Sequence, residues 1–290
     1  MGDTAHLKSS WVIVEELPVH FWQSKAEYPP DTPALIHLHG FGISGTYMLP
    51  TADLLAEHYR TYVPDLPGYG RSVHPGKVLS IPELARALLC FMDALDINKA
   101  ILIGNSMGCL TAIETAYEAP DRIERLILVS AAGGPHNRPI YRGLAQLSID
   151  GLRESPRMFT IAVPDYRRFG VINAFRLFWA MVHYPTVERV LEMQAPALAV
   201  LGSRDPLVNE ANIVNGTQDN STLDVIRIDG AAHAINYSHP RKLSHLVRQY
   251  LENEPLADDV TSDGTLVILR RHGDKAVEEP ITAAATASPA

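Results

Sequence analysis

A serine flanked by glycines is the part of the sequence that most directly suggests chemistry. The segment GNSMG at residues 104–108 follows the apolar run 100–103 and precedes a stretch of helix-compatible apolar residues. A tight turn between a strand and a helix leaves little space for side chains two residues before and two residues after the serine. Such a turn presents Ser106 on strained backbone at a helix N-terminus, where developing negative charge is favoured. The motif therefore predicts a nucleophilic serine, and the alternative is an ordinary serine in a glycine-flanked turn.

A serine nucleophile needs a base beside it, and the base needs an orienting acid. In one large group of serine hydrolases the acid and then the histidine follow the serine along the chain. Asp205 stands just after the apolar run 197–201, and His233 stands in a loop of small residues after the predicted strand 223–229. Both side chains should project over the carboxyl edge of a parallel sheet, the edge that also carries Ser106. We therefore predict a catalytic triad of Ser106, Asp205 and His233.

The same chemistry requires N–H donors for the oxygen that becomes negative during attack. Met107, directly after the serine, is expected to supply one backbone N–H. The segment HGFG at residues 39–42 follows the apolar run 34–38, and its glycines allow the backbone to approach a substrate closely. We predict Phe41 as the second donor and Gly40 and Gly42 as substrate contacts. The alternative is a glycine-rich turn without a catalytic role.

These residues need a scaffold of buried parallel strands. The near-continuous apolar runs 34–38, 100–103, 126–129 and 197–201 are typical of strands covered on both faces. Apolar residues at helical spacing separate the runs, for example over 81–95, where Ser80 and Glu83 form a capping box. Strand and helix in alternation predict right-handed βαβ units in an α/β sheet. Residues 11–15 and 19–22 have no helix between them and predict an antiparallel hairpin at the sheet edge.

Residues 134–190 interrupt the alternation and are too long for an unstructured loop in a compact domain, so we predict a mainly helical cap there. The segment carries eight arginines, no lysine and four acidic residues, and is therefore locally cationic. One or two arginines could bind a substrate carboxylate, although solvated helix surface is the simpler explanation for most of them. Its aromatic side chains Phe159, Phe175, Phe178 and Trp179 would form an apolar pocket, and the last three are the predicted substrate contacts.

Composition excludes several classes of protein. The chain has 290 residues, 46% of them hydrophobic, which is enough for a sizeable core. A net charge of −8 argues against nucleic-acid binding, and no apolar stretch approaches the ~20 residues of a membrane span. The start of the chain does not resemble a signal peptide, and two cysteines cannot form a disulfide scaffold, so we expect a cytoplasmic protein. Neither metal-ligand spacing nor a nucleotide-binding glycine motif is present, so neither a metal nor a cofactor is expected.

The order of the motifs HGFG, PDLPGYGRS, GNSMG, GSRDP and GAAHAINYSHP resembles the α/β-hydrolase superfamily over residues 10–252. This resemblance implies a mostly parallel, eight-stranded sheet flanked by helices, with a helical cap inserted after strand 6. The corresponding organisation is a core of residues 1–133 and 191–252, a cap of residues 134–190 and a partly disordered C-terminal extension of residues 253–290, within which the apolar run 265–269 could form an added strand. The GNSMG segment is also similar to that of meta-cleavage product hydrolases, and the chain has some similarity to carboxylesterases.

The resemblance and the predicted triad together imply a serine hydrolase. The expected reaction is cleavage of a carboxylic ester, thioester or lactone of a small, largely apolar substrate through an acyl-enzyme. One alternative is a carbon–carbon bond hydrolase of the meta-cleavage product type, and another is a cofactor-free perhydrolase or haloperoxidase. A ligand-binding protein with the hydrolase fold is a third. The expected partner is a small-molecule substrate, and the sequence leaves open whether the chain forms a homodimer.

Overall fold

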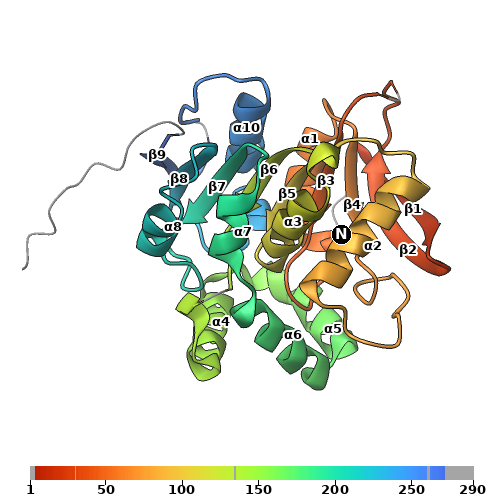
Figure 1. Cartoon of the computed structure of the whole chain (residues 1–290), viewed down its shortest axis with the longest axis horizontal. Helices are drawn as coiled ribbons and strands as arrows, with labels where there is room; N and C mark the ends of the chain where they lie inside the picture. Colours follow the sequence, from red (N-terminus) through yellow and green to blue (C-terminus); the bar gives the residue numbers. More distant parts are fainter. Residues whose placement is uncertain (1–3, 30, 134, 260–261, 272–290) are drawn as a thin grey trace, which may run out of the picture.

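The computed structural model describes residues 4–29, 31–133, 135–259 and 262–271 and is built around one nine-stranded sheet (Figure 1). The strand order across this sheet is β1-β2-β4-β3-β5-β6-β7-β8-β9. The strands are β1 (Leu7–Val14), β2 (Leu17–Ser24), β3 (Ala34–Leu38), β4 (Thr61–Pro64), β5 (Ala100–Asn105), β6 (Ile123–Val129), β7 (Ala197–Gly202), β8 (Leu223–Asp229) and β9 (Thr265–Arg270).

The central strands are parallel, as their continuous apolar runs predict. Every pair of adjacent strands within the run β4-β3-β5-β6-β7-β8 is parallel, and all five residues of β3 are buried. β1 and β2 form the predicted antiparallel hairpin at one edge. The expectation of an α/β fold with a mostly parallel sheet is confirmed.

The expected number of eight strands is wrong by one, because β9 adds an antiparallel strand beside β8. Without it, β8 would be an edge strand with a row of unpaired backbone N–H and C=O groups. The segment 265–270, which lies in the predicted C-terminal extension, therefore belongs to the sheet of the core. The end of that extension, residues 272–290, lies outside the described residues.

Helices cover both faces of the sheet. They are α1 (Leu49–Leu55), α2 (Ile81–Ala94), α3 (Met107–Glu118), α4 (Ile140–Arg153), α5 (Phe159–Phe169), α6 (Val171–His183), α7 (Thr186–Glu192), α8 (Glu210–Gly216), α9 (Ile235–Ser238) and α10 (Pro240–Leu251). Helices α2 and α3 pack together on one face, and α1 and α10 pack together on the other. Helix α2 begins with the predicted capping box of Ser80 and Glu83.

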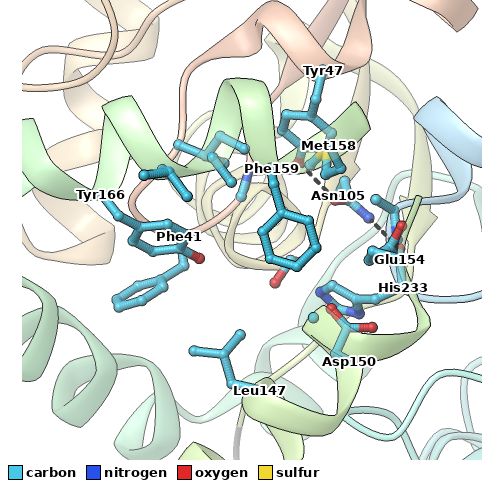
Figure 2. A pocket seen from close by; sticks show the side chains of 17 residues that line it. Phe41, Tyr47, Asn105, Leu147, Asp150, Glu154, Met158, Phe159, Tyr166 and His233 are labelled. Carbon is cyan, nitrogen blue, oxygen red and sulfur yellow. Dashed lines mark hydrogen bonds between the residues drawn. The ribbon is translucent and has the colours of Figure 1, made fainter. Parts of the chain in front are cut away.

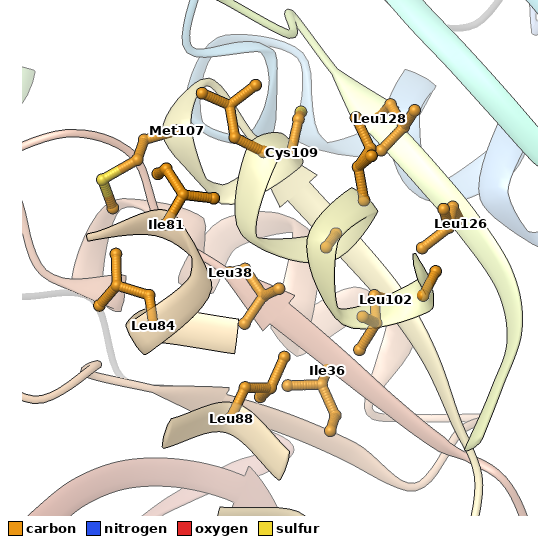
Figure 3. Packing of buried hydrophobic residues seen from close by; sticks show 14 of the residues in the cluster. Ile36, Leu38, Ile81, Leu84, Leu88, Leu102, Met107, Cys109, Leu126 and Leu128 are labelled. Atoms are coloured by element: carbon orange, nitrogen blue, oxygen red, sulfur yellow. The ribbon is translucent and has the colours of Figure 1, made fainter. Parts of the chain in front are cut away.

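Alternate residues of each central strand point to opposite faces, which gives the molecule two cores. Leu102 of β5 belongs to the cluster on the side of α2 and α3, whereas Ile103 belongs to the cluster on the side of α10. Figure 3 shows the first cluster, in which Ile36 and Leu38 of β3 face Leu84 and Leu88 of α2 among other apolar side chains. This two-sided burial explains why the strands carry continuous apolar runs instead of alternating ones.

Four helices, α4 to α7, occupy the segment between β6 and β7, and Figure 1 shows α4, α5 and α6 together at one end of the molecule. Hydrogen bonds join these helices to the rest of the chain. The N–H of Ser44 donates to Asp165 Oδ2 at 2.8 Å, and the N–H of Ala234 donates to Glu154 Oε1 at 2.7 Å. Within the described ranges, no helix is both long and apolar enough to cross a bilayer.

Candidate active site

Ser106 lies in a strained turn between β5 and α3. Its backbone angles are φ +55° and ψ −118°, a conformation that residues with a side chain rarely adopt. A Cβ atom added to Gly104 would lie 2.5 Å from the backbone N of Cys109, and one added to Gly108 would lie 2.0 Å from the carbonyl oxygen of Leu38. Both positions flanking the serine therefore require glycine. The turn holds Ser106, which is 7% exposed, at the wall of a cavity.

Asp205 follows β7 and His233 follows β8, so neighbouring strands deliver both side chains to the same edge of the sheet. His233 Nδ1 lies 2.7 Å from Asp205 Oδ2, and both residues are buried. The N–H of Leu207 donates to the other carboxylate oxygen, Oδ1, at 2.8 Å. Since Nδ1 is engaged by the acid, Nε2 is the ring nitrogen left for a serine proton. Ser106 and His233 line the same cavity.

The electrostatics of this pair favour its charged form. Burial alone would lower the pKa of His233, but the carboxylates of Asp205, Asp150 and Glu154 raise that pKa to about 9. Burial would raise the pKa of Asp205, yet the contacts with His233 and Leu207 hold it below its ordinary value. The imidazole is thus a stronger base than a solvent-exposed histidine.

Two backbone N–H groups, those of Met107 and Phe41, meet the requirements of an oxyanion site. Met107 is the first residue of α3, and the first N–H groups of a helix have no acceptor within the helix. Phe41 lies in the turn after β3 and is 8% exposed. Among the residues that the structure describes, neither the Met107 nor the Phe41 N–H has a hydrogen-bond acceptor. Both buried donors are therefore free to bind a ligand.

His39 holds the turn that carries Phe41. Its Nε2 accepts a hydrogen bond from the N–H of Leu66 at 3.0 Å, so its proton must be on Nδ1, which donates to the carbonyl oxygen of Gly40 at 3.0 Å. Burial lowers the pKa of His39 and keeps the ring neutral. Through these two hydrogen bonds, the buried His39 side chain connects the turn at Gly40 with the loop at Leu66.

Sequence reasoning missed a second buried network, which runs through Tyr47 and Asn105. The N–H of Gly40 donates to the Tyr47 hydroxyl at 2.8 Å, and this hydroxyl donates to Asn105 Oδ1 at 2.6 Å. Asn105 Nδ2 then donates to the carbonyl oxygens of Val129 and His233, each at 3.1 Å. The network ties together the three loops that carry Phe41, Ser106 and His233. Its only sequence signal is a polar residue at the end of an apolar strand.

A cavity of about 380 Å³ adjoins Ser106 and His233, a size typical of a small-molecule site (Figure 2). Its wall is mostly apolar and comes from α4, α5 and the loops that carry the predicted triad. The lining residues are Gly40, Phe41, Ile43, Tyr47, Asn105, Ser106, Leu147, Asp150, Gly151, Glu154, Met158, Phe159, Ala162, Val163, Tyr166, His233 and Ala234.

The structure places the predicted substrate contacts at different positions. Gly40 lines the cavity, and Phe178 lines a small pocket that adjoins it beside Phe41 and Ser106. Gly42 lies next to Tyr166, so close that an added Cβ would be 2.6 Å from the ring. Phe175 and Trp179 are 55% and 52% exposed and are not among the lining residues of either space. Helix α6 is apolar over most of its circumference, apart from the arc that carries Asn173, Arg176 and His183, so its sequence does not single out the aromatic side chains that turn inward.

Two acidic side chains of the inserted segment, Asp150 and Glu154, lie in the cavity beside His233 (Figure 2). Their spacing of four residues was visible in the sequence, but nothing local indicated that they face the predicted triad. No arginine or lysine is among the lining residues. In the described ranges, no group of three or more His, Cys, Asp or Glu side chains is arranged to hold a metal ion.

Comparisons with known proteins agree with this architecture. A family model described as the alpha/beta hydrolase fold matches residues 33–154. The pimeloyl-[acyl-carrier protein] methyl ester esterase of Aeromonas salmonicida is 27% identical over 252 residues, which cover 76% of this chain and 95% of the relative. A membrane phospholipase A superposes with a TM-score of 0.75 at 21% identity over 86% of this chain and 87% of its own. The enol-lactonase of Burkholderia xenovorans LB400 superposes with a TM-score of 0.68 at 21% identity over 84% of this chain and 100% of its own.

Proposed function

We propose that the chain is a member of the α/β-hydrolase superfamily and a serine hydrolase that cleaves carboxylic esters of small, largely apolar substrates through an acyl-enzyme. The observation that carries the proposal is the 2.7 Å contact between His233 Nδ1 and Asp205 Oδ2 at a cavity that Ser106 also lines. The name of the Aeromonas relative supports an ester as the scissile bond.

In the proposed reaction, His233 Nε2 takes the proton of Ser106 as the serine oxygen attacks the carbonyl carbon. Asp205 holds the ring in the required tautomer and stabilises its positive charge. The N–H groups of Phe41 and Met107 bind the oxygen that becomes negative. His233 then returns the proton to the leaving alkoxide. A water molecule, deprotonated by the same histidine, attacks the acyl-enzyme and releases the acid and the free serine.

The arrangement of the chain supports a division of labour between two parts. Residues 1–133 and 191–252 would form the catalytic core, and residues 134–190 would form a cap that selects the substrate. Helices α4 and α5 contribute most of the cap residues in the cavity wall, which supports that role. We further propose a cytoplasmic location, supported by two free cysteines, Cys90 and Cys109. A measurement of the protein's mass in solution would show whether it forms a homodimer.

Turnover of a neutral short-chain ester by the purified chain tests the proposal. Ser106→Ala should lower kcat by a factor of about 10⁴ or more, because the nucleophile is removed while the cavity stays intact. Ser148→Ala, on the exposed face of α4, is the matched control and should retain full activity. Undiminished turnover in Ser106→Ala would refute the assignment. A ligand-binding protein would release no acid from the ester, whether residue 106 is serine or alanine.

A further inference from the structure

Asp150 and Glu154 lie one helical turn apart at the C-terminal end of α4. Figure 2 shows the Asp150 carboxylate next to the ring of His233 and the Glu154 side chain on another side of the same residue. Glu154 Oε1 accepts the N–H of Ala234 at 2.7 Å, which fixes this acid against the loop of His233. The inserted segment thus brings two carboxylates to one wall of the cavity.

Each acid keeps a buried oxygen without a partner. Asp150 is 6% exposed, and its Oδ1 has no hydrogen-bond partner among the described residues. The same holds for Glu154 Oε2. Neither carboxylate takes part in an ion pair within the described ranges. A buried carboxylate without a partner is costly, so such a pair is stabilised when a cation or a proton reaches it.

The one positively charged side chain among the described residues of the cavity wall, that of His233, is already paired with Asp205, so the two acids leave the wall with an excess of negative charge. The lining residues of the cavity include these two acids but neither arginine nor lysine, although the inserted segment as a whole is rich in arginine. Arg153, between the two acids in the sequence, points outward and donates to the carbonyl oxygen of Arg204 at 2.7 Å. The expectation that an arginine binds a substrate carboxylate in this pocket therefore finds no support, because the charge that the wall presents is negative.

The rest of the wall suits an organic cation. Phe41, Phe159 and Tyr166 line the same cavity, and Figure 2 shows the Phe41 and Tyr166 rings on the opposite side of the view from Asp150, with the Phe159 ring between them. Aromatic faces attract alkylammonium groups, and they also accommodate the methyl or methylene groups that surround the charge. A bare metal ion would need more ligands than the described residues bring together.

The position beside His233 indicates which part of a substrate the acids would contact. In the proposed reaction His233 gives its proton to the leaving alkoxide, so the leaving alcohol must lie on the side of this ring. We propose that Asp150 and Glu154 form a cation subsite that selects esters whose alcohol part carries an alkylammonium group. This inference rests on the proposed ester hydrolase function, and it names the substrate class of that site.

Binding measured without turnover tests the subsite directly. Calorimetry on full-length Ser106→Ala protein would compare choline with 3,3-dimethylbutan-1-ol, which has the same shape and no charge. Choline should bind about tenfold or more tightly than the neutral alcohol, as expected for a partly buried charge contact. The preference should fall severalfold in Asp150→Asn and Glu154→Gln and disappear in the double variant. Glu188→Gln, exposed on α7, is the matched control and should keep the full preference.

Equal binding of the two alcohols, or a preference that survives the double variant, would overturn the subsite. The kinetic counterpart uses the choline and 3,3-dimethylbutyl esters of the same acid with the unmodified serine. The kcat/KM ratio of the two esters should follow the binding ratio in each variant. If the protein hydrolysed neither of the two esters, the proposed function would be refuted instead, because ester hydrolysis as such does not depend on the charge of the alcohol.

Discussion

Asn105 donates a hydrogen bond from Nδ2 to the carbonyl oxygen of His233, at 3.1 Å, across 128 residues of sequence. The same side chain accepts the hydroxyl of Tyr47 and lies directly before Ser106. Its backbone is therefore part of the serine turn while its amide holds the histidine loop. This one amide thus links the turn of the nucleophile directly to the loop of the base.

Replacing Asn105 by Ala should lower kcat about 10- to 100-fold with little change in KM, because small displacements of a base strongly slow proton transfer. Asn105→Asp should behave similarly, since it keeps the acceptor for Tyr47 and loses the donor to His233. Steady-state kinetics on a neutral ester measures both effects. Asn209→Ala, at the N-cap of α8, should cost about 1 kcal/mol of stability and leave kcat unchanged. An unaltered kcat in both Asn105 variants would show that the amide is dispensable.

The pH dependence of activity follows from the charges around His233. Only the neutral ring accepts the serine proton, so kcat/KM should rise as the pH increases through the pKa of His233, about 9. Asp150→Asn removes one of the carboxylates that raise this pKa, so the acidic limb should move to lower pH by about one unit. A pH profile of kcat/KM for wild type, Asp150→Asn and the exposed control Glu188→Gln measures the shift. A limb that stays in place or moves to higher pH contradicts the assigned role of Asp150.

A Ser–His–Asp chain of hydrogen bonds outside the predicted triad lies at the edge of the sheet. Ser9 Oγ is 2.8 Å from His20 Nε2, and His20 Nδ1 is 2.9 Å from Asp65 Oδ2. Ser9 lies on the regular strand β1, without the strained turn and helix N-terminus that present Ser106. Asp65 also accepts the N–H groups of Gly45 and Arg71, which indicates a structural role for this group.

A fluorophosphonate probe should therefore label Ser106 and leave Ser9 unmodified. Labelling requires a donor site for the developing oxyanion, and hydrogen bonds to the serine are not sufficient. Mass spectrometry of peptides from the labelled wild-type chain gives the site. Ser9→Ala should react at the wild-type rate, and Ser106→Ala should not react. Adduct formation at Ser9 would show that the edge group is a second reactive centre.

Replacing each of two glycines by alanine should change the free energy of unfolding in opposite directions. Gly108→Ala should destabilise the fold by about 3 kcal/mol or more, because the added Cβ would lie 2.0 Å from the carbonyl oxygen of Leu38. Gly151→Ala, inside α4 with no atom within 4 Å of the added Cβ, should stabilise the protein by about 0.5–1 kcal/mol. Denaturant unfolding of both variants measures the changes. Equal stability of the two would mean that the tight packing of the serine turn is absent in solution.

Local patterns were sufficient to predict the parallel core. The continuous apolar runs at 34–38 and 197–201 correspond to β3 and β7, because strands covered on both faces leave no polar side. The candidates Ser106, Asp205 and His233 follow from motif order and strand ends, because parallel strands bring all their carboxyl ends to one edge. The run 265–269 could be recognised only as a possible added strand, since whether a short apolar run completes a sheet edge depends on the strand beside it.

Tertiary structure alone decided what surrounds these candidates. The apolar residues of helix α6 extend over more of its circumference than one buried face needs, so only packing shows that Phe178 turns inward while Phe175 and Trp179 remain exposed. The contacts from Asn105 to His233 and from Glu154 to Ala234 join positions 128 and 80 residues apart. No local pattern encodes such contacts, because they depend on how segments that are distant in the sequence pack together. The candidate catalytic residues could therefore be predicted from the sequence. The charge and shape of the pocket could not, because they depend on how distant segments pack together.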